Sequence, residues 1–383
     1  MANFLEREHS VQRPEGESRY GWTVASNNRE ADTTDDGTPT LCPEAHMIRP
    51  PMLKPRDTIG VISPSSAVAA LCPQRFERGV GNLEALGFSV LCGTHVRARK
   101  GHTAGTLAER VSDLESMFRN EEVSAIIATI GGFNSNQLLD ELDYDLIRLN
   151  PKILMGYSDV TALLLGIHTM TGLVTFLGPA ILPQFGEHDG LHEYTEAAFR
   201  AVLMTPSPPG MWSPSRCWLT ERLRWDDEDT RPRREEPHAG PRVLRRGQTT
   251  GRILAGNLGT MLALLGTPYF PDLEGAILCI EEDEVEEPAT IDRMVTQLRS
   301  MGAFRQIGAL VVGRFDDQVG FSSDDPLADL LLTATRGLDL PVAVDYDFGH
   351  TDPVFTLPNG VLARIDFGDE AHFELLEAAV IQR

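Results

Sequence analysis

The chain has 383 residues, of which 42% are hydrophobic and 23% are charged, as expected for a globular protein long enough for two domains. Its formal net charge of −22 at pH 7 argues against nucleic-acid binding, because few basic groups are available to neutralise phosphates. No apolar stretch is as long as a membrane span. Five cysteines without metal-ligand spacing indicate a reducing compartment, and we therefore expect a cytoplasmic protein without a membrane partner.

The first 48 residues are polar and show no apolar periodicity. They lack the apolar core of a signal peptide and are predicted to form a disordered leader. Met47 and Met52 stand just before the first predicted strand, so translation starting at either one is an alternative that the sequence leaves open.

Strands and helices alternate from residue 49 to residue 185. Apolar runs predict strands at 58–62, 88–91, 125–130 and 153–155, and apolar residues at helical spacing predict helices at 72–86, 106–119 and 135–142. This alternation is typical of a Rossmann-like parallel sheet with flanking helices, in which ligands bind at the carboxyl ends of the strands. The polar turns 63–66, 131–136 and 156–159 all follow strands, so we expect them to share one edge of the sheet.

A linker with a variable loop is predicted at 186–247, where prolines, tryptophans and a charged run interrupt the pattern. Residues 248–383 predict a second, β-rich α+β domain. Its expected strands are 250–254, 276–280, 307–312, 342–345, 354–357 and 361–365, with helices at 257–265 and 291–301 and a hairpin turn at 358–360. The predicted fold class is α/β, with an N-terminal parallel-sheet domain, a β-rich C-terminal domain and an active site in the cleft between them.

Ser158 stands at the turn between the strand 153–155 and a helix that follows it. A serine at this place has an exposed hydroxyl, and the helix start behind it supplies free N–H groups and the positive end of the helix dipole. This is the geometry of a nucleophile elbow for acyl transfer. The alternative is that Ser158 or Asp159 simply caps the helix. Val160 also replaces the second glycine of the usual G-x-S-x-G pattern.

A nucleophilic serine needs a base and a group that orients the base. Among ten histidines, His350 is the best placed, in a loop between strands of the second domain. Glu281 ends the apolar strand 276–280 and would be held rigidly. The neighbouring acidic residues 282–284 are interpreted as solvated.

The chain resembles the serine peptidase family of LD-carboxypeptidases and microcin C immunity proteins. The resemblance extends from about residue 50 to the C-terminus, outside the leader and the charged part of the linker. The matching segments are ISPSS at 62–66, GTLAERVSDLESMF at 105–118, ATIGGFNSNQLLDELDYDLI at 128–147, PKILMGYSDVTALLLGIHTMTGLVTFLGP at 151–179, GRILAGNLGTMLALLGTPYFPDLEGAILCIEE at 251–282, IDRMVTQLRSMGAF at 291–304 and FGHTDPVFTLPNG at 348–360.

The resemblance implies that Ser158 is the nucleophile, that His350 is the general base and that Glu281 is the triad carboxylate, with Glu282 as the alternative. In this mechanism the oxyanion is stabilised by the backbone N–H of Asp159 and by one from the turn Gly131-Gly132. No metal or organic cofactor is required.

The family divides between enzymes that release D-alanine from peptidoglycan tetrapeptides and immunity enzymes that cleave a peptidyl- or aminoacyl-nucleotide. The stretch with Asn134 and Ser135 resembles the immunity branch. Trp218 or Trp225 could stack on an adenine, although packing of the linker explains tryptophans equally well. The rival readings are a muropeptide LD-carboxypeptidase and a non-catalytic binding homologue. A homodimer is suggested by the resemblance alone.

Overall fold

The N-terminal half of the chain forms a six-stranded sheet in the order β14-β5-β4-β3-β1-β2. The computed structural model describes residues 47–226, 228–324 and 326–382, so the expected leader lies outside the described residues except for its last two positions. The strands are β1 (Thr58–Ile62), β2 (Ser89–Cys92), β3 (Val123–Ala128), β4 (Ile153–Gly156), β5 (Phe176–Leu177) and β14 (Leu357–Pro358). All but β14 run parallel. β3 and β4 are buried along their whole length, which explains their continuous apolar runs.

Helices connect these strands, as the alternating pattern predicts. They are α1 (Val68–Leu71), α2 (Pro73–Ala85), α3 (Leu107–Arg119), α4 (Tyr144–Leu149), α5 (Thr161–Thr171) and α6 (Glu193–Leu203), with short turns η1 (Ser135–Leu138), η2 (Ser158–Val160) and η3 (Ile181–Phe185). α3 begins at a capping box in which the Thr106 side chain accepts a hydrogen bond from the Glu109 N–H. None of the helices that the structure describes is long and apolar enough to cross a membrane.

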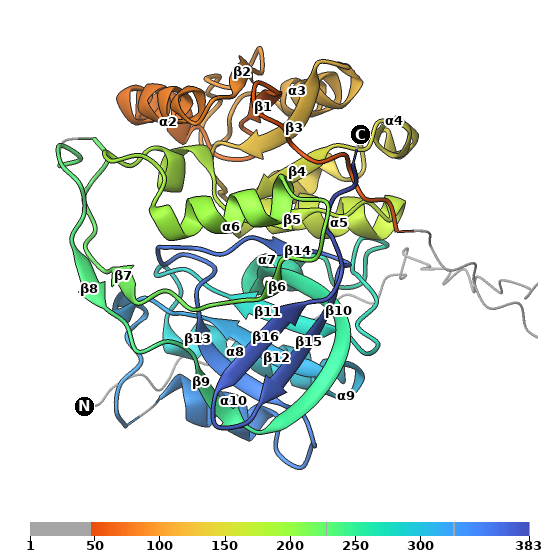
Figure 1. Ribbon diagram of the computed structural model, residues 1–383, viewed down its shortest axis with the longest axis vertical. Helices are drawn as coiled ribbons and strands as arrows, with labels where there is room; N and C mark the ends of the chain where they lie inside the picture. Colours follow the sequence, from red (N-terminus) through yellow and green to blue (C-terminus); the bar gives the residue numbers. More distant parts are fainter. Residues whose placement is uncertain (1–46, 227, 325, 383) are drawn as a thin grey trace, which may run out of the picture. The chain divides into compact units, whose positions relative to one another are not determined.

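The C-terminal half forms an eight-stranded mixed sheet in the order β6-β16-β15-β10-β11-β12-β13-β9. Its strands are β6 (Gly210–Met211), β9 (Arg242–Arg245), β10 (Gly247–Asn257), β11 (Ile277–Glu281), β12 (Ala309–Gly313), β13 (Val342–Tyr346), β15 (Leu362–Phe367) and β16 (Ala371–Leu375). The four central strands are parallel, and the flanking pairs are antiparallel. Its helical segments are α7 (Leu258–Ala263), α8 (Pro288–Ser300), α9 (Ala303–Gln306), η4 (Asp317–Val319) and α10 (Leu327–Ala334). This arrangement of a parallel sheet followed by a β-rich region confirms the predicted fold class (Figure 1).

Three of the expected features differ in the structure. Residues 358–360 do not join a hairpin, because β14 pairs with β5 in the first sheet whereas β15 pairs with β10 and β16 in the second. The expected linker 186–247 contains α6, the edge strands β6 and β9, and a separate ribbon of β7 (Cys217–Leu219) with β8 (Glu235–Pro237). The expected helix 135–142 is only the short turn η1, with the separate helix α4 after it.

The chain passes from the second sheet back to the first after β13. This passage begins at Tyr346 in the C-terminal sheet and ends at Leu357, whose partner Leu177 lies in β5 beside β4. The intervening loop contains His350, and it is therefore anchored in both sheets. The C-terminal segment also returns to the first half, where the Met52 N–H donates to the Ile381 carbonyl at 2.7 Å.

Candidate active site

Ser158 occupies a sharp turn at the carboxyl end of β4. Its φ of +60° places it in the left-handed region, although it is not a glycine. Such a conformation costs on the order of 1–3 kcal/mol and persists only where the surrounding structure enforces it. η2 and α5 follow at once, so the Asp159 backbone N–H lies in the first turn, where N–H groups have no partner within the helix. The turn therefore presents a hydroxyl and a free N–H together, as a nucleophile elbow requires.

Gly131 approaches this turn closely. A Cβ atom on residue 131 would lie 2.8 Å from Ser158 Oγ and 2.9 Å from the Asp159 nitrogen. These distances are shorter than real Cβ contacts, so only a glycine allows the backbone of residue 131 to lie this close to Ser158 and the Asp159 N–H. The loop after β1 fixes this turn, because Ser66 Oγ donates to the Gly131 carbonyl at 2.7 Å and Ser65 Oγ accepts from the Phe133 N–H at 3.1 Å.

His350 and Glu281 form an ion pair. Nδ1 of His350 lies 2.6 Å from Oε2 of Glu281, whose side chain is fully buried at the end of β11. Gly349 permits this approach, because a Cβ atom there would lie 2.6 Å from the same carboxylate oxygen. Glu282 instead accepts from Asn257 Nδ2 and from the Gly259 N–H, so the structure pairs Glu281 and not Glu282 with the imidazole.

The charge on His350 is set by carboxylates. Burial by itself lowers the pKa of the imidazole, but the adjacent Glu281 carboxylate, with smaller contributions from Asp283 and Glu284, raises the pKa to about 9. Nε2 of His350 lies 3.7 Å from Oδ2 of Asp283. Among the described residues, no hydrogen bond joins the His350 side chain to Ser158. Tyr157, the residue before Ser158, links the serine turn to the loop that contains His350. Its ring lies edge-on to the imidazole, with 5.0 Å between the ring centroids.

Ser158 opens into a cavity of about 250 Å³. The cavity is smaller than the roughly 300–1,000 Å³ typical of complete small-molecule sites, and it therefore suits one part of a substrate. The described residues that line it include four carboxylates and no Lys, Arg or His. They are Gly132, Phe133, Asn136, Ser158, Asp159, Asn257, Gly259, Thr260, Ala263, Glu282, Asp283, Val285, Glu286 and Met294.

The two halves of the chain match the two parts of one known family. Residues 59–178 match the LD-carboxypeptidase N-terminal domain, and residues 250–365 match the LD-carboxypeptidase C-terminal domain. The chain belongs to the LD-carboxypeptidase family. The expected family is thereby confirmed, and the chain is a carboxypeptidase-like hydrolase.

Relatives within the LD-carboxypeptidase family span nearly the same length. The microcin C7 self-immunity protein MccF of Escherichia coli is 35% identical over 331 residues, which are 85% of this chain and 95% of that protein. A probable murein peptide carboxypeptidase of Bacillus subtilis is 32% identical over 338 residues, which are 87% and 95% of the two chains. The solved structure of MccF in complex with glutamyl sulfamoyl guanosine has a TM-score of 0.81 at 33% identity, covering 87% of this chain and 99% of that one.

Several predicted binding residues of this family member lie outside the cavity. Ser135 is buried and donates from Oγ to the Asp159 carbonyl, so it fixes the elbow from behind. Asn134 does not line the cavity, whereas Asn136 does. Trp218 lies 5.2 Å from the Arg314 guanidinium, and Trp225 lies 4.4 Å from that of Arg75. Neither tryptophan lines the cavity, and both have partners in the fold.

The acidic segment after β11 was misread from the sequence. Glu282 is not solvated but 4% exposed, and its pKa is raised to about 7, chiefly by burial and next by the charge of Glu281. Asp283 lies beside His350. Sequence patterns could not reveal these positions, because an acidic run has the same appearance on an exposed loop. One feature of the sequence does point to the site: the acidic run follows directly after a buried strand, and ligands bind at the carboxyl ends of such strands.

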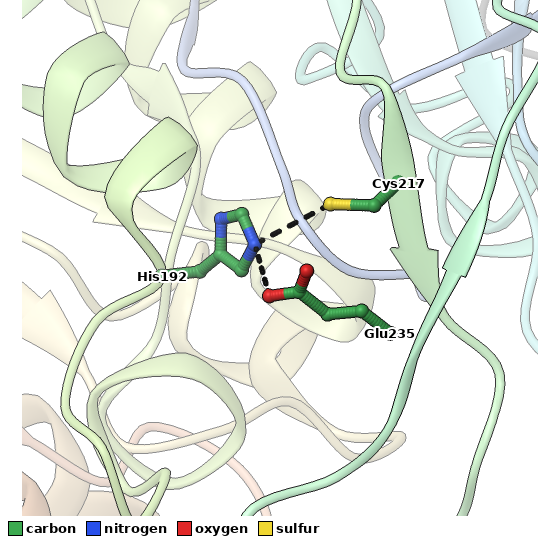
Figure 2. A group of neighbouring side chains, drawn as sticks. All are labelled: His192, Cys217 and Glu235. Carbon is green, nitrogen blue, oxygen red and sulfur yellow. Dashed lines mark hydrogen bonds and ion pairs between the residues drawn. The ribbon is translucent and has the colours of Figure 1, made fainter.

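A second polar cluster lies in the 186–247 segment (Figure 2). Nε2 of His192 is 3.7 Å from Cys217 Sγ and 3.3 Å from Glu235 Oε1, spacings compatible with a metal ion. Nδ1 of His192, however, accepts a hydrogen bond from the Tyr194 N–H at the start of α6. A neutral imidazole that accepts at Nδ1 carries its proton on Nε2, which therefore donates to the carboxylate and has no lone pair for a metal. The geometry favours a helix cap over a metal centre.

Proposed function

We propose that the chain is a serine carboxypeptidase or amidase that uses Ser158, His350 and Glu281 as a catalytic triad. His350 takes the Ser158 proton onto Nε2 as Oγ attacks the amide carbonyl, and then gives that proton to the leaving amine. Water hydrolyses the resulting acyl-enzyme by the same proton transfers in reverse. Glu281 holds the imidazole through Nδ1 and stabilises the imidazolium that forms.

The oxyanion of the tetrahedral intermediate is assigned to the space beside Gly131. The Asp159 N–H is the first donor, and the backbone of the Gly131-Gly132 turn supplies the second. The α5 segment behind the serine adds the positive end of its dipole. Electrostatic stabilisation of this kind commonly contributes the largest share of acyl-transfer catalysis.

The observation that carries the proposal is the His350–Glu281 pair beside the strained serine. A left-handed serine packed closely against a glycine turn, and a buried carboxylate 2.6 Å from the histidine, are parts that amide hydrolysis needs. A helix cap does not need a left-handed serine, and a binding module does not need the charged pair.

The favoured substrate class is an aminoacyl- or peptidyl-nucleotide joined by an amide. The support is the sequence identity of 35% with MccF, whose solved structures hold glutamyl sulfamoyl guanosine and aspartyl sulfamoyl adenosine. The second candidate is an L,D-tetrapeptide of peptidoglycan, supported by the sequence identity of 32% with a probable murein peptide carboxypeptidase. The cavity at Ser158 has the size for an amino-acid-sized part of either.

Parallel hydrolysis assays separate these candidates. The purified protein is offered an aminoacyl sulfamoyl adenosine or an L,D-tetrapeptide, and released amino acid is measured by liquid chromatography. We expect hydrolysis of the nucleotide conjugate by the wild type and a rate at least about 10³-fold lower for Ser158→Ala. Equal rates for both proteins would exclude the triad. Hydrolysis of the tetrapeptide alone would assign the chain to the muropeptide branch.

A further inference from the structure

His350 is contacted by a second carboxylate that the triad does not include. Glu281 contacts Nδ1, whereas Oδ2 of Asp283 lies 3.7 Å from Nε2. Nε2 is the nitrogen that must accept the serine proton. Asp283 and Ser158 line the same cavity, so a substrate bound to Ser158 would also contact Asp283.

The charged and titratable groups around His350 come from three segments. Glu281 ends β11, Asp283 and Glu284 follow in the next loop, and Tyr157 comes directly after β4. Glu284 is already paired with the Arg222 guanidinium. Asp283 has no such cation among the described residues; its Oδ1 accepts the Val285 N–H at 2.9 Å, which leaves Oδ2 facing the imidazole.

We propose that Asp283 is a positioning residue for His350: in the absence of substrate it keeps Nε2 protonated and facing its own carboxylate rather than Ser158. A carboxylate on each side of an imidazole favours its doubly protonated form by charge, and a doubly protonated ring cannot act as a base. The proton on Nε2 must therefore pass to solvent before Ser158 can be deprotonated. A substrate that enters the cavity displaces the Asp283 carboxylate from the imidazole and restores the base.

This inference rests on the proposed function for its meaning in catalysis, but its geometry can be tested without a substrate. The ring signals of His350 are followed by NMR between pH 5 and pH 10 in the free protein and assigned with His350→Gln. We expect Asp283→Asn to move the midpoint of this titration down by about 1 pH unit, since an opposite charge at this distance shifts an imidazole by that order. Asparagine keeps the acceptor for the Val285 N–H, so a merely structural role predicts no shift.

Glu287→Gln is the matched control, because Glu287 is an exposed carboxylate of the same loop and its side chain caps nothing. It removes one negative charge and should leave the midpoint unchanged. Asp283→Ser, which also keeps an acceptor, provides a second variant if Asp283→Asn does not fold. An unchanged midpoint in both Asp283 variants, or an equal shift in the control, would overturn the proposal.

Kinetics then separate this inference from the proposed function. In Asp283→Asn the acid limb of the pH profile of kcat/KM should move down by the same amount, which raises activity about 10-fold on that limb. A shifted NMR midpoint without hydrolysis of any substrate would sink the proposed function and leave the role of Asp283 standing. Hydrolysis together with an unshifted acid limb and an unshifted midpoint would overturn the role of Asp283 and leave the proposed function standing.

Discussion

Substituting Gly131 by alanine tests the proposed oxyanion site by displacing the turn that would form it. The new Cβ would lie 2.7 Å from Ser158 Cβ and 2.8 Å from Ser158 Oγ, well inside the usual carbon contact of about 3.5–4.0 Å. The φ of Gly131 is outside the left-handed region, so alanine meets a steric conflict and no backbone strain. The methyl group therefore forces the Ser158 turn to shift, which moves the Ser158 hydroxyl and the Asp159 N–H out of position.

The expected loss follows from the donor that becomes inaccessible. Removing one oxyanion donor lowers kcat by about 10²–10³-fold in acyl-transfer enzymes, and we expect a decrease of this size for Gly131→Ala with a smaller change in KM. Overpacking at a buried site also costs about 1–3 kcal/mol of stability. The assay is steady-state hydrolysis of an aminoacyl sulfamoyl adenosine, with urea denaturation of the same preparation to show that the variant is folded.

Gly81→Ala is the control for a glycine without a close neighbour. A Cβ atom there has nothing within 4 Å, and Gly81 lies inside α2, where alanine favours the helix by up to about 1 kcal/mol. We expect wild-type kcat and equal or higher stability. A folded Gly131→Ala that retains wild-type kcat would refute the assignment of the oxyanion to this space.

Three further predictions concern the charged groups. Glu281→Gln should lower kcat by about 10⁴-fold in the hydrolysis assay and move the acid limb to lower pH, because the carboxylate orients His350 and raises its pKa. Arg233→Ala should cost about 3–5 kcal/mol in urea denaturation, since it leaves the buried carboxylate of Asp352 without its ion-pair partner; a loss below about 1 kcal/mol would contradict this. The ion pair of His350 should stabilise the fold by roughly 3 kcal/mol below about pH 6.5, and this contribution should disappear as pH rises through 9, because the folded-state pKa is the raised one. Unfolding of the wild type and His350→Gln at pH 6 and pH 9.5 measures it, and a pH-independent difference would contradict it.

The sequence predicts the parts of the fold whose signal is local. The buried strands β3 and β4 are apolar throughout, and Ser158 follows one of them directly, so both strands and the position of the turn could be expected. The sequence predicts only 250–254 of the eleven-residue strand β10. Its first residues, from Gly247, are polar and alternate between partly buried and exposed, so they lack an apolar signal. Tertiary packing extends this strand where its composition does not.

Contacts between distant segments could not be predicted from local patterns. β14 is two residues long, and its pairing with β5 depends on the path of the chain between the sheets. Asp283 belongs to an acidic run, and only the fold distinguishes it from the other members by placing it beside Nε2 of His350. The expectation that Ser158, His350 and Glu281 act together depends on the family resemblance, because no spacing in the sequence relates a strand end to a loop 69 residues later.

The central claim is that Ser158 forms a covalent acyl-enzyme. The direct measurement is peptide-mapping mass spectrometry after rapid acid quenching of the wild-type protein with an aminoacyl sulfamoyl adenosine. The account predicts that the peptide containing Ser158 gains the mass of the aminoacyl group and loses it with time, and that Ser158→Ala shows no adduct. An adduct on another residue, or complete hydrolysis by Ser158→Ala at the wild-type rate, would contradict the account.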